Sequence, residues 1–147
     1  MTIEPLISLN QVVPLLIECG LPASDVSIAF PHQFFGLRLE DSGPLVGIVG
    51  LENYQSVGLL RSLAVASPCR NRGPAHQLVA FVEAQAAYWH IDTLFLLTTT
   101  AESFFTNLGY SSVSRDTAPP AIQATSQFSG LCPATSAFLS KHVTNAG

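Results

Sequence analysis

The sequence predicts a mixed α/β fold of the α+β type, with helices on a central sheet that is antiparallel at first and parallel at its centre. Three apolar runs follow one another at 32–40, 44–52 and 56–66 with short polar turns between them, which predicts an antiparallel meander. A helical pattern then leads to a fourth run at 93–99, and such a crossover joins parallel strands. The 147 residues, 48% of them hydrophobic, suffice for one core, so we expect a single domain over residues 1–147.

The other elements alternate helix and strand. The stretch SLNQVVPLLIECG has helical spacing of apolar residues, begins at a capping residue and stops at Gly20, which predicts a first helix. From Pro74 to Trp89 the apolar residues recur three and four positions apart, which predicts a longer helix with one buried stripe. After the run at 93–99 we expect a short helix at 101–109, a strand at 110–114, a helix at 119–131 and a last strand at 135–142.

Charge is scarce in this chain. Only 11% of the residues are charged, against roughly 25% in an average soluble protein. The surface must therefore rely on uncharged polar residues or be covered by a partner, and a homodimer fits that composition. The net charge of −4 argues against a nucleic-acid surface and against a polybasic membrane contact.

The amino terminus predicts a cytoplasmic protein. No basic residue precedes the first apolar stretch, and Pro14 and Glu18 interrupt it, so neither a signal peptide nor a spanning helix fits. The three cysteines are far apart and form no CxxC pair, which suits a reducing compartment. The four histidines show no ligand spacing, so we expect no metal site.

The most informative stretch is CRNRGPAHQL, between the third apolar run and the long helix. A helix start offers unpaired backbone amides and the positive end of a dipole, which suit phosphate oxygens. Two of the six basic residues, Arg70 and Arg72, lie here, and Gly73 allows close approach to the backbone. The pattern matches neither GxxxxGK[ST] nor GxGxxG, so a nucleotide-hydrolysis loop and a Rossmann loop are poorly supported. The alternative is an arginine-rich loop without a ligand.

The stretch SLAVASPCRNRGPAHQLV resembles the acetyl-CoA signature of the GNAT N-acetyltransferases, in which Arg70, Gly73 and Ala75 fill the defined positions. About 30 residues later, SFFTNLGY resembles the family's second motif. A narrower likeness, to acetyltransferases associated with arsenic-resistance operons, is carried by LLRSLAV, LLTTTAESFFTNLGY and AIQATSQFSGLCPATSAF. The chain therefore contains two motifs that resemble those of one enzyme family, in the order in which the family has them.

The resemblance implies a GNAT-like sheet with splayed central strands and acetyl-CoA as cosubstrate. The pantetheine arm would pair with the backbone of residues 63–65, and the pyrophosphate would lie on the amides of residues 71–76. Pro74 departs from the common pattern because it has no N–H, so we expect the arginines to compensate. The implied cofactor-binding residues are Leu63, Ala64, Val65, Arg70, Asn71, Arg72, Gly73, Pro74, Ala75 and His76, with Ser103, Phe105 and Asn107 on the short helix.

The catalytic residues of the family are only partly present. Many members carry Glu near the position of Leu59, so Glu52 is the nearest candidate base; the alternatives are a solvated carboxylate or one that binds the substrate ammonium. Phe105 stands where many members have a Tyr acid, which leaves Tyr110 as a candidate acid or a packing residue. Arg61 is expected to face either solvent or an acidic group of the substrate.

A run of threonines and a single cysteine are the last candidates for the site. Thr99, in the run from Thr98 to Thr100, could present a hydroxyl to the acceptor, although β-branched residues are common in strands anyway. Cys132 has no second cysteine near it in sequence to form an arsenic site.

The sequence therefore predicts an acetyl-CoA-dependent N-acetyltransferase. Its acceptor would be the amino group of a small molecule, such as an amino acid or an arsenical or glutamate-like analogue. The alternative is a CoA-binding or sensing domain of the same fold with little or no turnover, because the strand Glu and the second-motif Tyr are missing.

Overall fold

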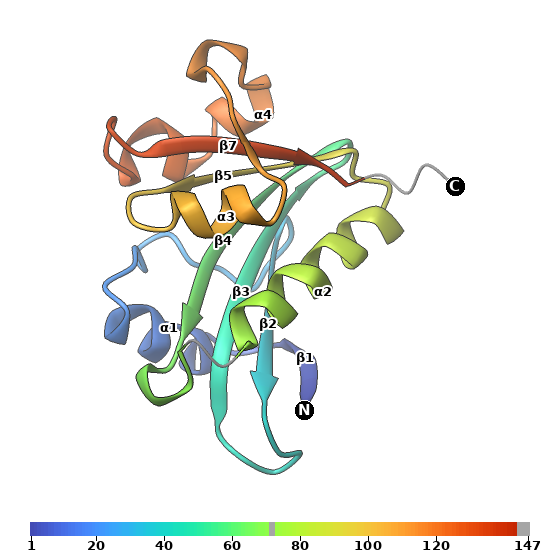
Figure 1. The fold of residues 1–147 in the computed structure, drawn as a ribbon, viewed down its shortest axis with the longest axis vertical. Coiled ribbons are helices and arrows are strands. Elements are labelled where there is room, and N and C mark those ends of the chain that lie inside the picture. Colours follow the sequence, from blue (N-terminus) through green and yellow to red (C-terminus); the bar gives the residue numbers. More distant parts are fainter. Residues whose placement is uncertain (71–72, 144–147) are drawn as a thin grey trace.

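A seven-stranded mixed sheet forms the centre of the protein in this computed structural model, which describes residues 1–70 and 73–143 (Figure 1). The strands lie in the order β1-β2-β3-β4-β5-β7-β6. Their bounds are β1 Thr2–Leu6, β2 His32–Arg38, β3 Leu45–Tyr54, β4 Val57–Val65, β5 Thr93–Thr98, β6 Ser111–Ser112 and β7 Ala137–His142. The helices are α1 Leu9–Glu18, α2 Pro74–Tyr88, α3 Glu102–Asn107 and α4 Pro120–Gln123, with 3-10 turns at Ser67–Cys69 and Arg115–Thr117 and a π-helical turn at Gln127–Leu131.

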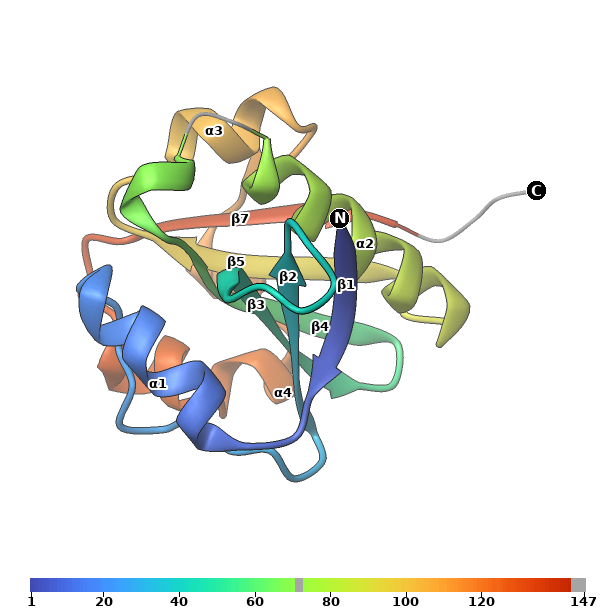
Figure 2. The same cartoon turned by 90° about the horizontal axis from the view of Figure 1, so that it is seen from below.

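The predicted fold class is confirmed. Strands β2, β3 and β4 form the antiparallel meander, and β4 and β5 run parallel on either side of the α2 crossover. Figure 2 shows α2 and α3 on one face of the sheet and α1 and α4 on the other. The predicted stripe of α2 faces the sheet, with Leu78, Val79, Val82 and Ala86 all buried. Each large apolar side chain buried in this way contributes roughly 1.5–3 kcal/mol to stability.

Three expectations about elements are corrected. The edge strand β1 was not predicted; it pairs antiparallel with β2 and buries only Leu6, so it has no alternating pattern. The strand expected at 110–114 shortens to β6, Ser111–Ser112, paired with the middle of β7. The helix expected at 119–131 divides into α4 and the π-helical turn, between which Thr125 donates its hydroxyl to the carbonyl of Ile122 over 2.7 Å.

The strands β4 and β5 separate along their length. They pair only from Val57 with Thr93 to Leu59 with Phe95, although both strands continue beyond these residues. The pairing of β3 with β4 shifts where Gly50 faces Arg61, and Ser62 next to it has a φ of 60°. A bulge of this kind bends its strand. Together the bulge and the early end of pairing open the sheet between β4 and β5.

Candidate active site

An open cleft with a volume of about 790 Å³ lies between the end of β4 and the starts of α2 and α3. We call it the cosubstrate cleft. Its lining includes many of the residues that the GNAT likeness implied for CoA, together with Thr100, Ala101 and Phe104, which the sequence reasoning missed. The predicted residues that line it are Leu63, Val65, Arg70, Gly73, Pro74, Ala75 and His76.

The start of α2 directs backbone amides at this cleft. Gly73 precedes the helix with a φ of 100°, a conformation that residues with a Cβ rarely adopt. Pro74 takes the first helical position, where a missing N–H costs nothing. The first hydrogen bond of the helix runs from the Gln77 N–H to the Gly73 carbonyl over 3.1 Å. The amides of Ala75 and His76 therefore have no partner within the helix and can bind an anion.

The other side of the cleft is the free edge of β4. The Ala66 N–H donates to the Val46 carbonyl over 2.8 Å toward β3, so the N–H and carbonyl of Val65 point the opposite way, toward the opening. The Arg70 Nε donates to the Val65 carbonyl over 3.0 Å, and the Cys19 thiol lies 3.6 Å from the same oxygen. The predicted cation thus rests on the strand edge where the pantetheine arm is expected.

The other residues implied for CoA lie in different places. Ala64 is buried against the α1 side, and Phe105 packs edge-to-face between Phe104 and Tyr110. Ser103 and Asn107 are exposed on α3, and Asn107 lines none of the four cavities found among the described residues. The predicted Asn71 and Arg72 lie outside the described residues. The missed Phe104 follows Ser103 in the second motif, and its ring stands 5.0 Å from that of His76 across the cleft.

A second cavity of about 280 Å³ lies on the other side of the opening between β4 and β5; we call it the acceptor cavity. A narrower space of about 110 Å³ shares Leu63 and Ala101 with the cosubstrate cleft, and Ser62 and Leu97 with the acceptor cavity. The narrow space therefore joins the two larger ones through the splayed strands. The acceptor cavity is lined by Gly20, Leu21, Pro22, Ser62, Leu97, Thr98, Thr99, Thr100, Gln127, Cys132, Pro133 and Ser136.

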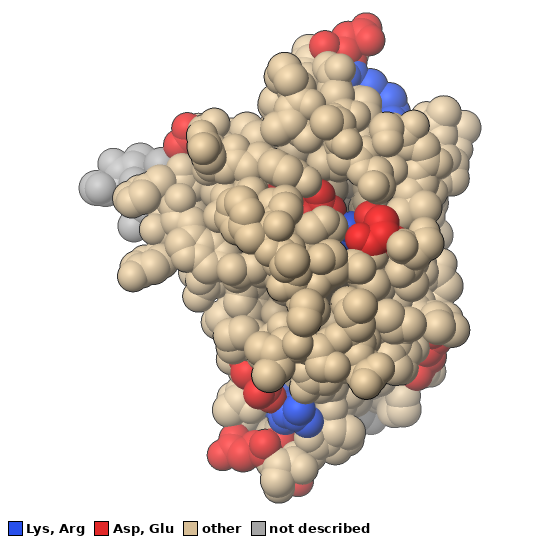
Figure 3. Space-filling model, turned by 180° about the vertical axis from the view of Figure 1, so that it is seen from behind, with Lys and Arg blue, Asp and Glu red and all other residues tan. Residues whose placement is uncertain are grey.

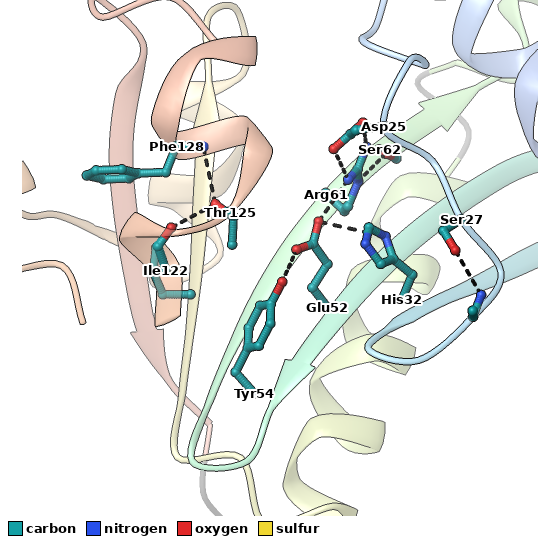
Figure 4. A network of polar contacts seen from close by, with 11 residues as sticks. Asp25, Ser27, His32, Glu52, Tyr54, Arg61, Ser62, Ile122, Thr125 and Phe128 are labelled. Atoms are coloured by element: carbon teal, nitrogen blue, oxygen red, sulfur yellow. Dashed lines mark hydrogen bonds and ion pairs between the residues drawn. The ribbon is translucent and has the colours of Figure 1, made fainter. Parts of the chain in front are cut away.

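Beside these cavities lies a buried charge cluster formed by Asp25, His32, Glu52, Tyr54 and Arg61 (Figure 4). The Arg61 guanidinium donates to both oxygens of Asp25 over 2.5 and 2.6 Å and to Glu52 Oε2 over 2.8 Å. The Tyr54 hydroxyl donates to the other Glu52 oxygen. His32 Nδ1 is buried without a hydrogen-bond partner, 3.9 Å from Glu52 Oε2.

Two expectations about this cluster are corrected. Arg61 does not face solvent, because its side chain is fully buried and its Nε donates to Ser62 Oγ over 2.9 Å in addition to the two carboxylates; it lines the narrow space, and its contact with a substrate stays a prediction. Glu52 is no solvated strand end, because it is 2% exposed and both oxygens accept hydrogen bonds. Its role as a base stays a prediction.

The cluster shifts the pKa of two of its members. Burial lowers the pKa of Arg61, but the hydrogen bonds that its guanidinium donates to Asp25 and Glu52, together with the charges of these carboxylates, outweigh burial and raise that pKa overall. Burial, and then the hydrogen bond to Glu52, raise the pKa of Tyr54 well above its ordinary range. Two carboxylates around one guanidinium give these three groups together a net negative charge. The face shown in Figure 3 is mostly uncharged, with one group of acidic and basic atoms near its centre and a few others toward its edges.

The remaining predicted residues divide between surface and core. Thr99 is exposed and lines the acceptor cavity. Tyr110 is 2% exposed, donates its hydroxyl to Glu83 Oε2 over 2.9 Å, and lines none of the four cavities. Burial, and then the charge of Glu83, raise its pKa well above the ordinary range. This geometry favours the packing alternative over an acid at the thioester.

The described residues also bear on two broader expectations. No helix in residues 1–70 and 73–143 is long and apolar enough to cross a membrane. In the same residues no three His, Cys, Asp or Glu side chains gather in a way that could hold a metal ion.

A mixed sheet that opens between its central parallel strands, beside an anion-binding helix start, is the arrangement expected of an acetyl-CoA-dependent acetyltransferase. The sequence profile described as the acetyltransferase (GNAT) domain matches residues 31–112. The chain therefore belongs to the GNAT acetyltransferase family.

Solved structures share this fold. N-acetylglutamate synthase from Neisseria gonorrhoeae, complexed with coenzyme A and N-acetyl-glutamate, is 22% identical with a TM-score of 0.78 over 99% of this chain and 36% of its own. This chain thus spans little more than a third of that enzyme. An aminoglycoside 6'-N-acetyltransferase complexed with coenzyme A is 16% identical, with a TM-score of 0.73 over 100% of this chain and 99% of its own. A GNAT-family acetyltransferase from Staphylococcus aureus is 15% identical, with a TM-score of 0.71 over 97% and 100%.

Proposed function

We propose that this protein transfers the acetyl group of acetyl-CoA to the amino group of a small molecule. The observation that carries the proposal is the opening between β4 and β5, which joins the cosubstrate cleft to the acceptor cavity. An acetyl thioester in this opening and an amine in the acceptor cavity would meet without crossing solvent, so the two reactants would be held in one geometry.

The backbone provides the proposed recognition of CoA. The pyrophosphate would accept hydrogen bonds from the amides of Ala75 and His76, and the arginines of the preceding loop would add charge. The pantetheine arm would pair with the free edge of β4, after Arg70 leaves the Val65 carbonyl. The Val65 N–H would then stabilise the charge that develops on the thioester oxygen.

The proposed chemistry is direct attack of the amine on the thioester carbon. The amine nitrogen forms a bond to the acetyl carbon, the carbon–sulfur bond breaks, and the amine proton leaves to solvent or to the Glu52 side of the site. The negative charge of the cluster with Glu52 and Arg61 would attract the incoming ammonium. Because Tyr110 is engaged with Glu83, water is the better proton source for the CoA thiolate, a tolerable leaving group with a pKa near 8.5.

The narrower features of the proposal come from the sequence. The likeness to arsenic-resistance acetyltransferases suggests an amino acid, or an arsenical or glutamate-like analogue, as acceptor. The three similar proteins named above give no support for this branch, which remains a proposal, as do a homodimer and the single domain over residues 1–147.

The test of the cosubstrate site replaces its two arginines. We expect Arg70→Ala combined with Arg72→Ala to raise the Kd for CoA at least tenfold, about 1.4 kcal/mol. The matched control is Arg38→Ala, because Arg38 pairs with Glu4 at the edge of the sheet and lines none of the four cavities. Unchanged binding of CoA by the double variant in a calorimetric titration would refute the assignment.

A second candidate function is a CoA-binding or sensing domain without turnover. It is favoured by Tyr110, whose hydroxyl is held by Glu83, and by Leu59 at the strand position where many members carry Glu. Thiol release from acetyl-CoA against a panel of amines distinguishes the two functions. Thermal stabilisation by acetyl-CoA with no thiol release across the panel would support the second.

A further inference from the structure

The acceptor cavity is lined by hydrogen-bonding groups that carry no charge. Hydroxyls come from Ser62, from the run Thr98 to Thr100 and from Ser136, and Gln127 adds an amide. None of the described residues that line the cavity is Lys, Arg, His, Asp or Glu. Its volume of about 280 Å³ lies near the lower end of the usual range of ligand pockets, roughly 300 to 1,000 Å³. The lining therefore suits a small molecule with neutral polar groups.

One of these hydroxyls has no partner in the protein. Ser136 is 6% exposed, and its Oγ forms no hydrogen bond within the described structure. Native proteins pair nearly all such buried groups, because an unpaired one keeps the full cost of its lost hydration. Rotation of the Ser136 side chain toward the cavity that the residue lines would let a ligand hydroxyl or amide supply the missing bond.

The charged side chains behind the lining of the acceptor cavity disfavour an acidic ligand. Arg61 lines the narrow space beside the cavity, next to the lining residue Ser62, but four of its donor contacts go to Asp25, Glu52 and Ser62 itself. The two carboxylates outnumber that guanidinium, so the cluster repels an anion. A substrate carboxylate in the cavity would lose hydration without gaining a cationic partner.

A second cationic side chain, Arg115, lies on the outer side of the lining of the acceptor cavity. The Arg115 Nη2 donates to the carbonyls of Pro133 and Ser136 over 3.3 and 3.1 Å, and its guanidinium lies 5.3 Å from the Phe128 ring centre. Arg115 is absent from the cavity lining. Its contacts hold the backbone of the lining, and they leave the cavity without a charged donor from this side.

We propose that the acceptor is a small primary amine whose other polar groups are uncharged hydroxyls or amides, and that an acceptor carboxylate is selected against, so the cavity disfavours the amino-acid acceptor that the sequence likeness suggests. This inference rests on the proposed acetyl transfer, because it takes the acceptor cavity as the amine site of that reaction. The ammonium group meets the negative cluster, and the neutral groups of the acceptor bond to Ser136 and the threonine hydroxyls.

The test compares amines that differ in one group. Serinol and L-serine, and threoninol and L-threonine, share an amine and a hydroxyl but differ in the carboxylate. Binding to the CoA-bound protein is measured by calorimetric titration, and turnover by thiol release from acetyl-CoA. We expect each amino alcohol to bind at least tenfold more tightly than its amino acid, and kcat/KM to follow the same order. Equal or tighter binding of the amino acids, or no binding of any of the four, would overturn the inference.

Binding and turnover separate this inference from the proposed function. Preferential binding of the amino alcohols without acetyl transfer supports the selectivity of the cavity and refutes the transferase proposal. Transfer to the amino acids in preference to the alcohols supports the transferase and refutes the selectivity.

Variants connect the preference to particular side chains. Ser136→Ala is expected to weaken serinol binding at least fivefold and to leave the Kd for CoA unchanged. The matched control, Ser129→Ala, changes an exposed serine of the π-helical turn that does not line the cavity, and should change neither constant. Thr99→Lys adds a cation at the exposed rim and should shift the preference toward L-serine. An unchanged preference in Thr99→Lys, together with full serinol binding by Ser136→Ala, would place the acceptor elsewhere.

Discussion

Loss of the Arg61 guanidinium should destabilise the protein more than any other single change in the buried charge cluster. Arg61→Met leaves the Asp25 and Glu52 carboxylates facing each other without a counterion. Removing one partner of a buried pair costs about 3–5 kcal/mol. We expect about 3 kcal/mol, because the Asp25 side chain is 11% exposed and can regain some hydration, and because Glu52 keeps the Tyr54 hydroxyl.

Removal of one carboxylate should cost less. Asp25→Asn keeps the shape of the side chain and leaves Arg61 balanced by Glu52, so the loss is that of hydrogen bonds to a charged group, about 1.5–3 kcal/mol. In the double variant Arg61→Met with Glu52→Gln, one uncompensated charge is gone. The cost of the double variant should therefore fall below the sum of the single costs by at least about 1 kcal/mol.

Urea unfolding at neutral pH measures these differences. The control is Arg38→Met, because Arg38 and Glu4 form a pair with side-chain exposures of 22% and 45%, for which about 0–1 kcal/mol is expected. The reasoning is wrong if Arg61→Met costs less than about 1 kcal/mol, or if Asp25→Asn costs more than Arg61→Met.

Two further predictions test the helix start and the buried tyrosines. Gly73→Ala puts a Cβ at a φ of 100°, so it should lower the free energy of unfolding by about 1–2 kcal/mol and raise the Kd for CoA. The control Gly130→Ala, which has open space around it and no left-handed φ, should change neither quantity. Thermal unfolding and titration with CoA measure both variants, and equal stabilities would contradict the prediction. Because burial raises the pKa of Tyr54 and Tyr110 above the ordinary 10.0, unfolded chains lose these protons first and stability should fall as pH rises beyond 10.0. Urea midpoints from about pH 9 to about pH 11 should show a flatter decline when both are replaced by Phe, and identical slopes would refute the assignment.

The parts that could be predicted depend on neighbours in the sequence. The stripe of α2 follows from the spacing of Leu78, Val79 and Val82, and the start of that helix from Gly73 and Pro74. Such local patterns fix the element whatever the rest of the chain does. Many of the residues that line the cosubstrate cleft could therefore be predicted from the start of α2 and the second motif.

Long-range pairing could not be predicted in the same way. A charged residue in an apolar strand suggests solvent, and the carboxylates of Asp25, 36 positions away, and of Glu52 explain how Arg61 can be buried. Tyr110 likewise finds its partner Glu83 at 27 positions. The acceptor cavity draws on four separated segments of the chain, so no single motif contains it.

The opening between β4 and β5 also carries a risk of aggregation. A strand that loses its neighbour in the middle of a sheet presents unpaired backbone groups, and these attract strands from other chains. The contact of Arg70 and Cys19 with the Val65 carbonyl covers one such group. The arginine that we propose for cosubstrate binding therefore also shields part of this exposed strand edge from strands of other chains.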